Sequence, residues 1–283
     1  ISFRMNYLNK DTFDSKKVLK NRNLAFVSRY ALGKDYHDEM RNRLHLIAKK
    51  INNEIDNFKY RAFVDSAPVL EKAIAQKAGL GWIGKNTLLI NKDSGSYFFL
   101  GEIYTNIDFE IDSKEKNYCG ECNECINICP TKAIIAPNVL DAKKCIAYLT
   151  IEFKGSIPIQ YRESIGNRIF GCDDCQIVCP WNRFSKETKI QEFSHKNKLD
   201  SSSLLSLFKW TEEEFKINTQ NTPINRISYF QWLRNIIIGL GNSEKNTKVV
   251  KVLEEKKLKI NNPILEEHIN WAIKKQNTNL NTF

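Results

Sequence analysis

Apolar and polar residues alternate at the start of the chain, and short apolar runs recur through its first third. Alternation of this kind predicts β-strands, because successive side chains of a strand point to opposite faces of a sheet. The predicted strands are residues 1–8, Leu24–Val27, Phe63–Val64, Thr87–Ile90 and Tyr97–Ile103.

Apolar residues at helical spacing predict two helices between these strands, at Asp38–Ile55 and Pro68–Ala78. Strands mixed with helices are typical of the α/β and α+β classes, and we expect an α+β fold overall. We assign residues 1–112 to this first domain. Because the chain begins with Ile1 inside an alternating run, we expect it to be a fragment that lacks the N-terminal part of the domain.

The last part of the chain, residues 186–283, has the pattern of packed helices. Apolar residues recur at spacings of three and four in Ile227–Leu240, Lys245–Lys257 and Pro263–Lys275, and Gly-Asn and Asn-Asn-Pro breakers separate these segments. We expect antiparallel helices stacked like part of a solenoid. The segment 113–185 has too little apolar periodicity for a core of its own, so we expect metal clusters to replace one there.

Eight cysteines support that expectation, and their spacing divides them into two sets of four. The run CxxCxxCxxxCP is typical of two-cluster ferredoxins, in which the fourth cysteine binds the other cluster. A second run near residue 175 also ends in Cys-Pro, and Ile169 stands where it would need one more cysteine. Cys145 fills that place. The predicted ligands are Cys119, Cys122, Cys125 and Cys179 for cluster I, and Cys129, Cys145, Cys172 and Cys175 for cluster II.

Two other uses of the cysteines remain open. Paired CxxC motifs also suit two structural zinc sites with four thiolates each, although the triple CxxCxxC and both Cys-Pro endings favour iron–sulfur clusters. A disulfide framework is typical of small secreted domains, which a 283-residue chain does not resemble.

The overall charge is positive, with 43 Lys and Arg against 33 Asp and Glu, a net charge of +10. This excess is compatible with a polyanionic partner, and equally with a Lys-rich composition that has no functional meaning. No apolar run is long enough to span a bilayer. We expect a cytoplasmic monomer with reduced thiols and no membrane partner.

Residues 79–84 match the dinucleotide-binding pattern GxGxxG, but their context differs from that of a dinucleotide site. The pattern needs a strand before it and a helix after it, whereas here a helix precedes it and the strand-like Thr87–Ile90 follows. Gly79 is typical of the residue just beyond a helix end. A glycine loop that allows a flat, bulky ligand to approach the backbone is the simpler interpretation.

Asp65 is the candidate acid. It follows a predicted strand and precedes a predicted helix, so it is either the N-cap of that helix or a carboxyl group at the C-terminal end of a strand, where α/β folds gather their chemistry. In the second case, burial would raise its pKa towards the range of a proton donor. The four histidines show no metal-ligand spacing, and we interpret each as a surface or core residue.

Several long segments together resemble epoxyqueuosine reductases over nearly the whole chain. They are SRYALGKDYH, VDSAPVLEKAIAQKAGLGWIGKNTLLI, the CxxCxxCxxxCPTKAI run, CIAYLTIEFKGSIP, GCDDCQIVCPWNR and TPINRISYFQWLRNIIIGLGN. The resemblance implies a cobalamin-dependent tRNA-modifying enzyme, related to reductive dehalogenases, that removes the epoxide oxygen of epoxyqueuosine at the wobble position. Two 4Fe–4S clusters and an external low-potential donor would supply electrons, and an acid the proton.

The same resemblance assigns residues to roles. The aspartate of VDSAP is the family's proposed proton donor, which implies this role for Asp65. The corrinoid-binding segments imply contacts from Ser28, Asn86, Thr87, Leu89, Leu100 and Asp173. Lys154 and Arg162 are similar to residues near the tRNA, although solvated charge is the plain alternative. The helical tail resembles HEAT-like repeats, in which Arg226, Arg234 and Lys248 would meet phosphate.

Two rival functions share part of this pattern. A corrinoid reductase or dehalogenase of a small molecule would need the clusters and the acid but not a basic helical tail. A ferredoxin-type electron carrier would need the clusters without Asp65. The predicted boundaries are 1–112 for the corrinoid-binding reductase domain, 113–185 for the ferredoxin-like domain and 186–283 for the tRNA-binding helices.

Overall fold

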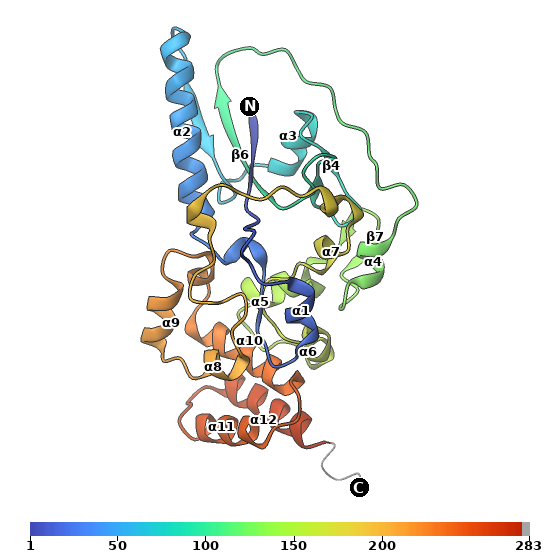
Figure 1. The fold of residues 1–283 in the computed structure, drawn as a ribbon, viewed down its shortest axis with the longest axis vertical. Helices are drawn as coiled ribbons and strands as arrows, with labels where there is room; N and C mark the ends of the chain where they lie inside the picture. Colours follow the sequence, from blue (N-terminus) through green and yellow to red (C-terminus); the bar gives the residue numbers. More distant parts are fainter. Residues whose placement is uncertain (279–283) are drawn as a thin grey trace.

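The computed structural model describes residues 1–278, and the molecule is elongated, with helical layers at one end and a small sheet at the other (Figure 1). The sheet has three antiparallel strands in the order β1–β6–β3, so that β6 is central. They are β1 (Ser2–Asn6), β3 (Tyr60–Phe63) and β6 (Phe98–Thr105). All three correspond to predicted strands, with ends shifted by a few residues.

Two helices cover opposite faces of this sheet. The long helix α2 (Tyr36–Glu54) packs on the face of β6 to which Gly101 belongs, where a Cβ atom would come within 3.0 Å of Met40 and Leu44 side chains. Its buried residues recur every four positions and form an apolar stripe. The short helix α3 (Glu71–Lys77) contacts β1 and β6 on the other face, which Glu102 occupies because side chains alternate along a strand.

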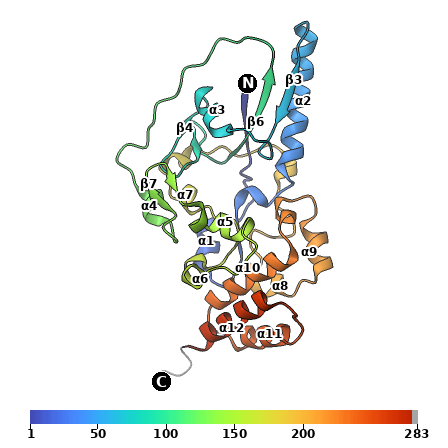
Figure 2. The same cartoon turned by 180° about the vertical axis from the view of Figure 1, so that it is seen from behind.

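The cluster segment is made of short elements and lies beside the sheet (Figure 2). Three small two-stranded sheets lie in these parts of the molecule, and one of them, β2 with β9, joins the cluster segment to the first part of the chain. They pair β2 (Phe26–Val27) with β9 (Arg168–Phe170), β4 (Trp82–Ile83) with β5 (Leu89–Ile90), and β7 (Ile134–Ala136) with β8 (Val139–Leu140). The helices of the segment are α4 (Glu124–Ile128), α5 (Ile146–Ile151), α6 (Ile159–Ile165) and α7 (Asp174–Ile177), while α1 (Ser15–Lys20) belongs to the first part of the chain.

Five α-helices lie between residues 186 and 278, and the last three occur close to where the sequence predicts them. The five are α8 (Leu204–Phe208), α9 (Glu212–Thr219), α10 (Tyr229–Asn242), α11 (Thr247–Lys257) and α12 (Pro263–Asn277). Helix α12 packs against both α10 and α11. Reciprocal hydrogen bonds between an N-cap and the third helical residue fix the starts of α9 and α10, at Thr211 and Ser228. The described part of the chain also has five 3₁₀ turns: η1 (Arg29–Ala31), η2 (Ala142–Lys144), η3 (Pro180–Phe184), η4 (Gln191–Phe193) and η5 (Pro223–Arg226).

The largest hydrophobic core crosses all three predicted domains. It joins Val27 of β2 and Phe170 of β9 to buried side chains of α10 and α12, including Trp232 and Ile269. A second cluster, around Ile146 and other buried side chains of residues 146–165, also packs on α10. The boundaries at 112 and 185 therefore mark changes of sequence pattern within one packed body. Within residues 1–278, no helix combines the length and apolar character that a membrane crossing requires.

Candidate functional site

Asp65 lies just beyond the end of β3, where the chain leaves the sheet and turns toward α3. Its Oδ2 atom accepts a hydrogen bond from the hydroxyl of Tyr36 at 2.6 Å and lies 3.2 Å from Nε2 of His37. The other ring nitrogen of His37, Nδ1, lies 2.6 Å from Oδ1 of Asp35. The imidazole therefore bridges two carboxylates, an arrangement that favours its protonated form.

This contact decides where the proton resides. The hydrogen bond from His37 is the largest influence on Asp65 and lowers the pKa of its carboxyl group, against an opposing effect of burial. Burial lowers the pKa of His37, but its hydrogen bonds to Asp35 and Asp65 outweigh burial, so the pKa is raised. The charge of Arg226, whose Nη2 lies 2.8 Å from Nε2 of His37, opposes this increase without reversing it. The prediction that burial raises the Asp65 pKa is therefore wrong, because the hydrogen bond from His37 outweighs the effect of burial.

Asp65 is also not a helix cap. Helix α3 begins at Glu71, three residues later than predicted, and Leu70 occupies its N-cap position. The φ angle of Asp65 is 38°, in the left-handed region that residues other than glycine seldom adopt. Such a conformation costs about 1–3 kcal/mol and persists only where surrounding contacts impose it. The side chain is 49% exposed, so its carboxyl group is accessible.

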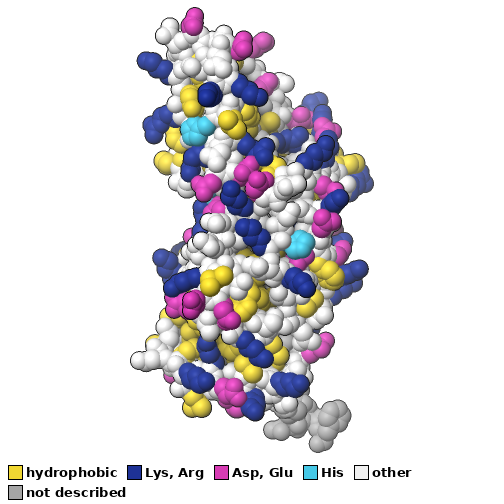
Figure 3. Space-filling model, turned by 60° about the vertical axis from the view of Figure 1, so that its left-hand side comes forward, with side chains coloured by type: hydrophobic (Ala, Val, Ile, Leu, Met, Phe, Trp, Pro, Cys, Tyr) yellow, Lys and Arg dark blue, Asp and Glu magenta, His cyan; other side chains and the backbone are white. Residues whose placement is uncertain are grey.

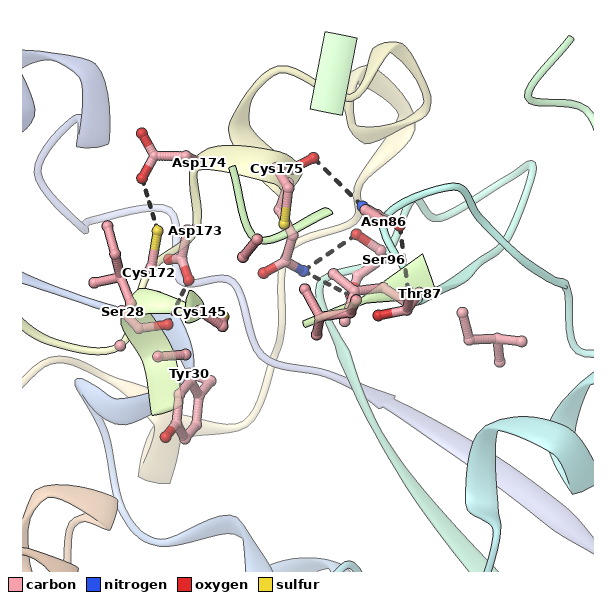
Figure 4. Close-up of a pocket in the computed structure, with 18 of the residues that line it drawn as sticks. Ser28, Tyr30, Asn86, Thr87, Ser96, Cys145, Cys172, Asp173, Asp174 and Cys175 are labelled. Carbon is pink, nitrogen blue, oxygen red and sulfur yellow. Dashed lines mark hydrogen bonds between the residues drawn. The ribbon is translucent and has the colours of Figure 1, made fainter. Parts of the chain in front are cut away.

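A cavity of about 440 Å³ connects Asp65 with part of the cysteine-rich segment. All the residues predicted to contact the corrinoid line this cavity: Ser28, Asn86, Thr87, Leu89, Leu100 and Asp173. In Figure 4, Ser28 and Asp173 lie on one side, Asn86 and Thr87 on the other, and Cys175 between them. Sequence segments more than 80 residues apart thus meet at one wall, as the hydrogen bond from Asn86 to the carbonyl group of Cys175 illustrates.

Two backbone features shape the walls of this cavity. Thr87 has a φ angle of 66°, unusual for a β-branched residue, in the tight turn between β4 and β5. Gly171 has a φ angle of 71°, and a Cβ atom there would lie 2.5 Å from the Cβ atom of Ser28. Ser28 and the main-chain amide of Arg29 both donate to the buried carboxylate of Asp173. This wall is therefore fixed by close packing and hydrogen bonds.

The eight cysteines are divided between two cavities. Cys129, Cys145, Cys172 and Cys175 line the large cavity. Cys119, Cys122, Cys125 and Cys179 line a second cavity of about 200 Å³. The two groups are the predicted ligand sets of clusters II and I, and Cys122 is the one exposed cysteine of the eight.

The arrangement of the thiols bears on whether the cysteines form disulfides, zinc sites or iron–sulfur clusters. All eight cysteines are free, which excludes the disulfide framework. In residues 1–278, no three His, Cys, Asp or Glu side chains are gathered tightly enough to bind a single metal ion. A tetrahedral zinc ion needs four sulfurs at about 2.3 Å from one point, whereas a cluster holds its ligands further apart. Thiols spread around a cavity therefore fit a cluster better than zinc.

Hydrogen bonds from the surrounding chain reach two of these sulfurs. The indole N–H of Trp82 donates to Sγ of Cys119 at 3.4 Å, and the main-chain amide of Ala133 donates to Sγ of Cys129 at 3.2 Å. Such bonds stabilise the negative charge of bound sulfur and tune the reduction potential of a cluster. They give Trp82, in the glycine loop of residues 79–84, a role beside cluster I.

The glycine loop itself has the predicted context. Gly79 follows the last turn of α3 with a φ angle of 67°, and the amide of Leu80 bonds back to the carbonyl of Ala75 at 3.0 Å. This is the usual bonding beyond a helix end. Strand β4 lies within the loop and β5 follows it, so its glycines do not open a helix as they do in a dinucleotide site.

Comparisons with known proteins agree with this arrangement. A family model described as "4Fe-4S double cluster binding domain" matches residues 118–182, and one described as "Epoxyqueuosine reductase QueG, DUF1730" matches residues 1–66. The epoxyqueuosine reductase of Pseudomonas aeruginosa is 50% identical over 276 residues, which cover 97% of this chain and 76% of the relative. The chain belongs to the epoxyqueuosine reductase family. The Escherichia coli enzyme is 47% identical over 98% of this chain and 72% of its own.

Solved structures of epoxyqueuosine reductases have the same fold. One, in complex with an epoxyqueuosine-modified tRNA stem loop, superposes with a TM-score of 0.87 at 31% identity and covers 98% of this chain and 72% of its own. Another, from Bacillus subtilis, has its catalytic aspartate loop swung out of the active site and gives a TM-score of 0.87 at 30% identity, with the same coverage. The prediction of two 4Fe–4S clusters is confirmed by the matching double-cluster domain.

The structure does not support all the residues predicted to contact tRNA. Arg162 is only 1% exposed, its Nη2 lies 2.7 Å from Oε2 of Glu267, and its Nε donates to the carbonyl of Ile157. The prediction that Arg162 contacts tRNA is therefore wrong, because protein groups surround it. The prediction that Arg234 contacts phosphate is wrong for the same reason, because Arg234 is fully buried and donates to three main-chain carbonyls.

The remaining basic candidates lie on the surface. Lys154 and Lys248 are exposed, while Arg226 lies against His37 at the edge of the Asp65 site. On the face shown in Figure 3, Lys and Arg side chains are interspersed with Asp and Glu along the length of the molecule. The net positive charge is therefore not gathered into one patch on that face.

We expect Lys154→Ala and Arg162→Ala to have different effects. Lys154→Ala should weaken tRNA binding without changing stability. The slope of log K for tRNA binding against log salt concentration should fall in magnitude by about one. Arg162→Ala should lower the free energy of unfolding by about 1–3 kcal/mol, because it leaves buried acceptors unpaired. Filter binding at several salt concentrations and thermal unfolding measure the two effects. Normal stability with weakened tRNA binding for Arg162→Ala would contradict its structural role.

Sequence reasoning missed two residues of the Asp65 site. His37 was interpreted as a surface or core residue, and Tyr36 was not singled out. The two are adjacent at the start of α2 and face a carboxyl group 28 residues further along the chain. The only available signal was their place in the segment SRYALGKDYH, which carries the family resemblance. His268, in contrast, is a core histidine as predicted, with no exposed surface.

Proposed function

We propose that this chain reduces epoxyqueuosine to queuosine at the wobble position of tRNA, with two 4Fe–4S clusters and cobalamin as cofactors. The observation that carries the proposal is that Asp65 and the four cysteines of cluster II line one cavity. Removing the oxygen of an epoxide needs two electrons and a proton. One cavity with a proton-donating group at one wall and a cluster at another meets both needs.

The cysteine sets define a direction for electrons. Cluster I, held by Cys119, Cys122, Cys125 and Cys179, lies next to the surface at Cys122, so an external low-potential donor would reduce it first. Cluster II, held by Cys129, Cys145, Cys172 and Cys175, would pass electrons into the large cavity. Cobalamin, when bound there, would supply a strongly reducing cobalt centre.

The cavity has features that suit a large, flat cofactor. Its volume of about 440 Å³ lies in the range of ligand sites, and its lining is mainly apolar with a few fixed polar groups. Ser28, Asn86, Thr87, Leu89, Leu100 and Asp173 are the proposed contacts. Among the described residues that line it, none is a histidine, so no imidazole ligand for cobalt is provided from its walls.

The proton would come from the Asp65 site. Hydrogen bonds to Asp35 and Asp65 raise the pKa of His37, which stands 3.2 Å from the carboxyl group and so favours a proton next to Asp65. The hydroxyl group of Tyr36 fixes the same carboxyl oxygen at 2.6 Å. As negative charge develops on the departing oxygen, the proton passes through Asp65 to that oxygen and His37 becomes neutral. Asp65 is thus the proposed proton donor and His37 its source.

The partner and setting follow from the same proposal. The substrate is a tRNA that carries epoxyqueuosine, and Lys154 and Lys248 are exposed residues available for its phosphates. The HEAT-like character of the helices after residue 186, a monomeric state and a cytoplasmic location remain parts of the proposal. The loop that carries Asp65 is exposed, and we infer that it moves as the aspartate loop of the Bacillus subtilis relative does.

Reconstitution tests the proposal. We expect the protein, loaded with iron, sulfide and cobalamin and supplied with a low-potential reductant, to convert epoxyqueuosine in tRNA to queuosine, and to lose this activity when cobalamin is omitted. Nucleoside analysis by mass spectrometry measures the product, and iron analysis should give about eight irons per chain. Zinc in place of iron, or turnover that does not depend on cobalamin, would overturn it. Faster reduction of a small halide or epoxide would favour the dehalogenase-like alternative.

A further inference from the structure

Two glutamates meet beneath the Asp65 loop. Glu71 is the first residue of α3, and Glu102 lies in β6 on the face that α3 covers. Their side chains are within hydrogen-bonding contact of each other, and Glu102 has no exposed surface. Two ionised carboxylates have only acceptors, so a close contact between them requires a proton.

No basic side chain among the described residues forms an ion pair with either glutamate. In residues 1–278, neither glutamate forms an ion pair within 4.0 Å, and Oε2 of Glu102 has no conventional hydrogen-bond donor, while Oε1 accepts only a bond of 3.4 Å from Ser2. Burial, and next the charge of Glu71, raise the pKa of Glu102 to about 8, and the pKa of Glu71 is raised as well. The charged side chains that face the pair are Asp65, His37 on α2 and Lys72 on α3.

Glu71 also holds the Asp65 loop. Its Oε1 atom accepts a hydrogen bond from the main-chain amide of Asp65 at 2.6 Å. Between β3 and α3 the loop is largely exposed, and its other internal bonds are local, such as that from the amide of Val69 to the carbonyl of Ala67. The strained backbone at Asp65, with its φ of 38°, needs a contact that enforces it. Glu71 provides this contact from a helix that packs on the sheet.

We propose that Glu71 and Glu102 share one proton and together form a latch that holds the Asp65 loop at the cavity, a positioning role that rests on the proposed function of Asp65. With the proton present, the carboxyl groups of Glu71 and Glu102 stay in contact. Glu71 then still accepts a hydrogen bond from the main-chain amide of Asp65. When the proton leaves, two like charges stand in contact at a buried position. Glu71, which is only partly buried, then turns toward solvent and releases the amide.

A plain helix-capping role for Glu71 makes a different prediction. An acceptor near a helix start would bind the Asp65 amide at any pH at which the fold is intact, and its protonation would not matter. The latch, in contrast, opens as the shared proton is lost. The dependence of the Asp65 contact on pH therefore separates the two roles.

Amide hydrogen exchange of the peptide that spans residues 64–70 tests the latch without requiring turnover. In the cluster-loaded protein, after correction for intrinsic exchange, we expect protection to be constant at low pH and to fall about tenfold per pH unit above about pH 8. Glu71→Gln should remove this pH step and keep the protection, because its amide accepts from Asp65 and donates to ionised Glu102. In Glu71→Ala, the amides of residues 64–70 should lack this protection at every pH. Glu110→Gln changes an exposed glutamate elsewhere and, as a control, should keep the wild-type profile.

The infrared carbonyl band of a protonated carboxyl group gives a second readout. We expect this band near neutral pH in the wild type and its loss in Glu71→Gln. Flat protection across the pH range in the wild type, or a pH step that persists in Glu71→Gln, would overturn the latch. A clear pH step in a protein that does not reduce epoxyqueuosine would leave the latch standing and reject the proposed function. Reduction of epoxyqueuosine together with a flat exchange profile would support the proposed function and overturn the latch.

Discussion

Asp65→Asn is expected to abolish epoxide reduction while both clusters and tRNA binding remain. An amide is isosteric with the carboxyl group and keeps the bond to Tyr36, but it cannot pass the proton of His37 to the departing oxygen. General acid catalysis is worth about 10²–10⁴-fold in rate, so turnover should fall by at least two orders of magnitude. Single-turnover formation of queuosine measures the loss.

Matched variants isolate this effect. Asp108→Asn changes an exposed aspartate of the loop after β6 and should leave the rate unchanged. His37→Gln keeps the Asp65 carboxyl group and removes only its ring partner, so it should slow the reaction less than Asp65→Asn does. Normal turnover of Asp65→Asn, with unchanged iron content, would show that the carboxyl group is not the proton donor.

Paired cysteine substitutions should remove either one cluster or both, depending on the set from which the two residues come. Cys145→Ala with Cys172→Ala removes two ligands of cluster II, and we expect iron to fall from about eight to about four per chain and activity to vanish. Cys145→Ala with Cys119→Ala takes one ligand from each set and should damage both clusters. Iron analysis and EPR spectra of the reduced protein distinguish the two results.

The same comparison contains its own control. Cys119→Ala with Cys122→Ala should also leave about four irons, now in cluster II, with a different EPR signal. If the pair of Cys145 and Cys172 removed all iron while the mixed pair kept half, the proposed division of ligands would be wrong. The division depends on Cys145, the one cysteine outside both runs, which lines the cavity with Cys172 and Cys175.

Much of the fold could be predicted from local patterns of apolar and polar residues. Helices α2, α10, α11 and α12 and strands β1 and β6 were predicted within a few residues, because each buries one periodic face. The start of α3 was placed too early, since Pro68 suits a first helical turn, whereas the chain uses Asp65–Leu70 as a loop. Here the contact with Glu71 and the strained φ of Asp65 override local preference.

The site was less accessible to sequence reasoning wherever it depends on contacts between distant residues. Cysteine spacing is local and was sufficient to divide the ligands, whereas the burial of Arg162 depends on Glu267, which is 105 residues away. Likewise, the low pKa of Asp65 is set by His37, and the pair of Glu71 and Glu102 requires α3 to lie on β6. A basic or acidic residue gives no local sign of which partner will surround it.

The core shared by β9 and α10 bears on whether the cluster segment can fold by itself. Ile169 and Phe170 adjoin the last cysteine run, and the side chain of Asn235 on α10 donates to the carbonyl of Ile169 at 2.9 Å. Residues 113–185 moved alone into another protein would expose these apolar side chains to water. We therefore expect residues 113–185 to need the helices that follow them in order to fold stably.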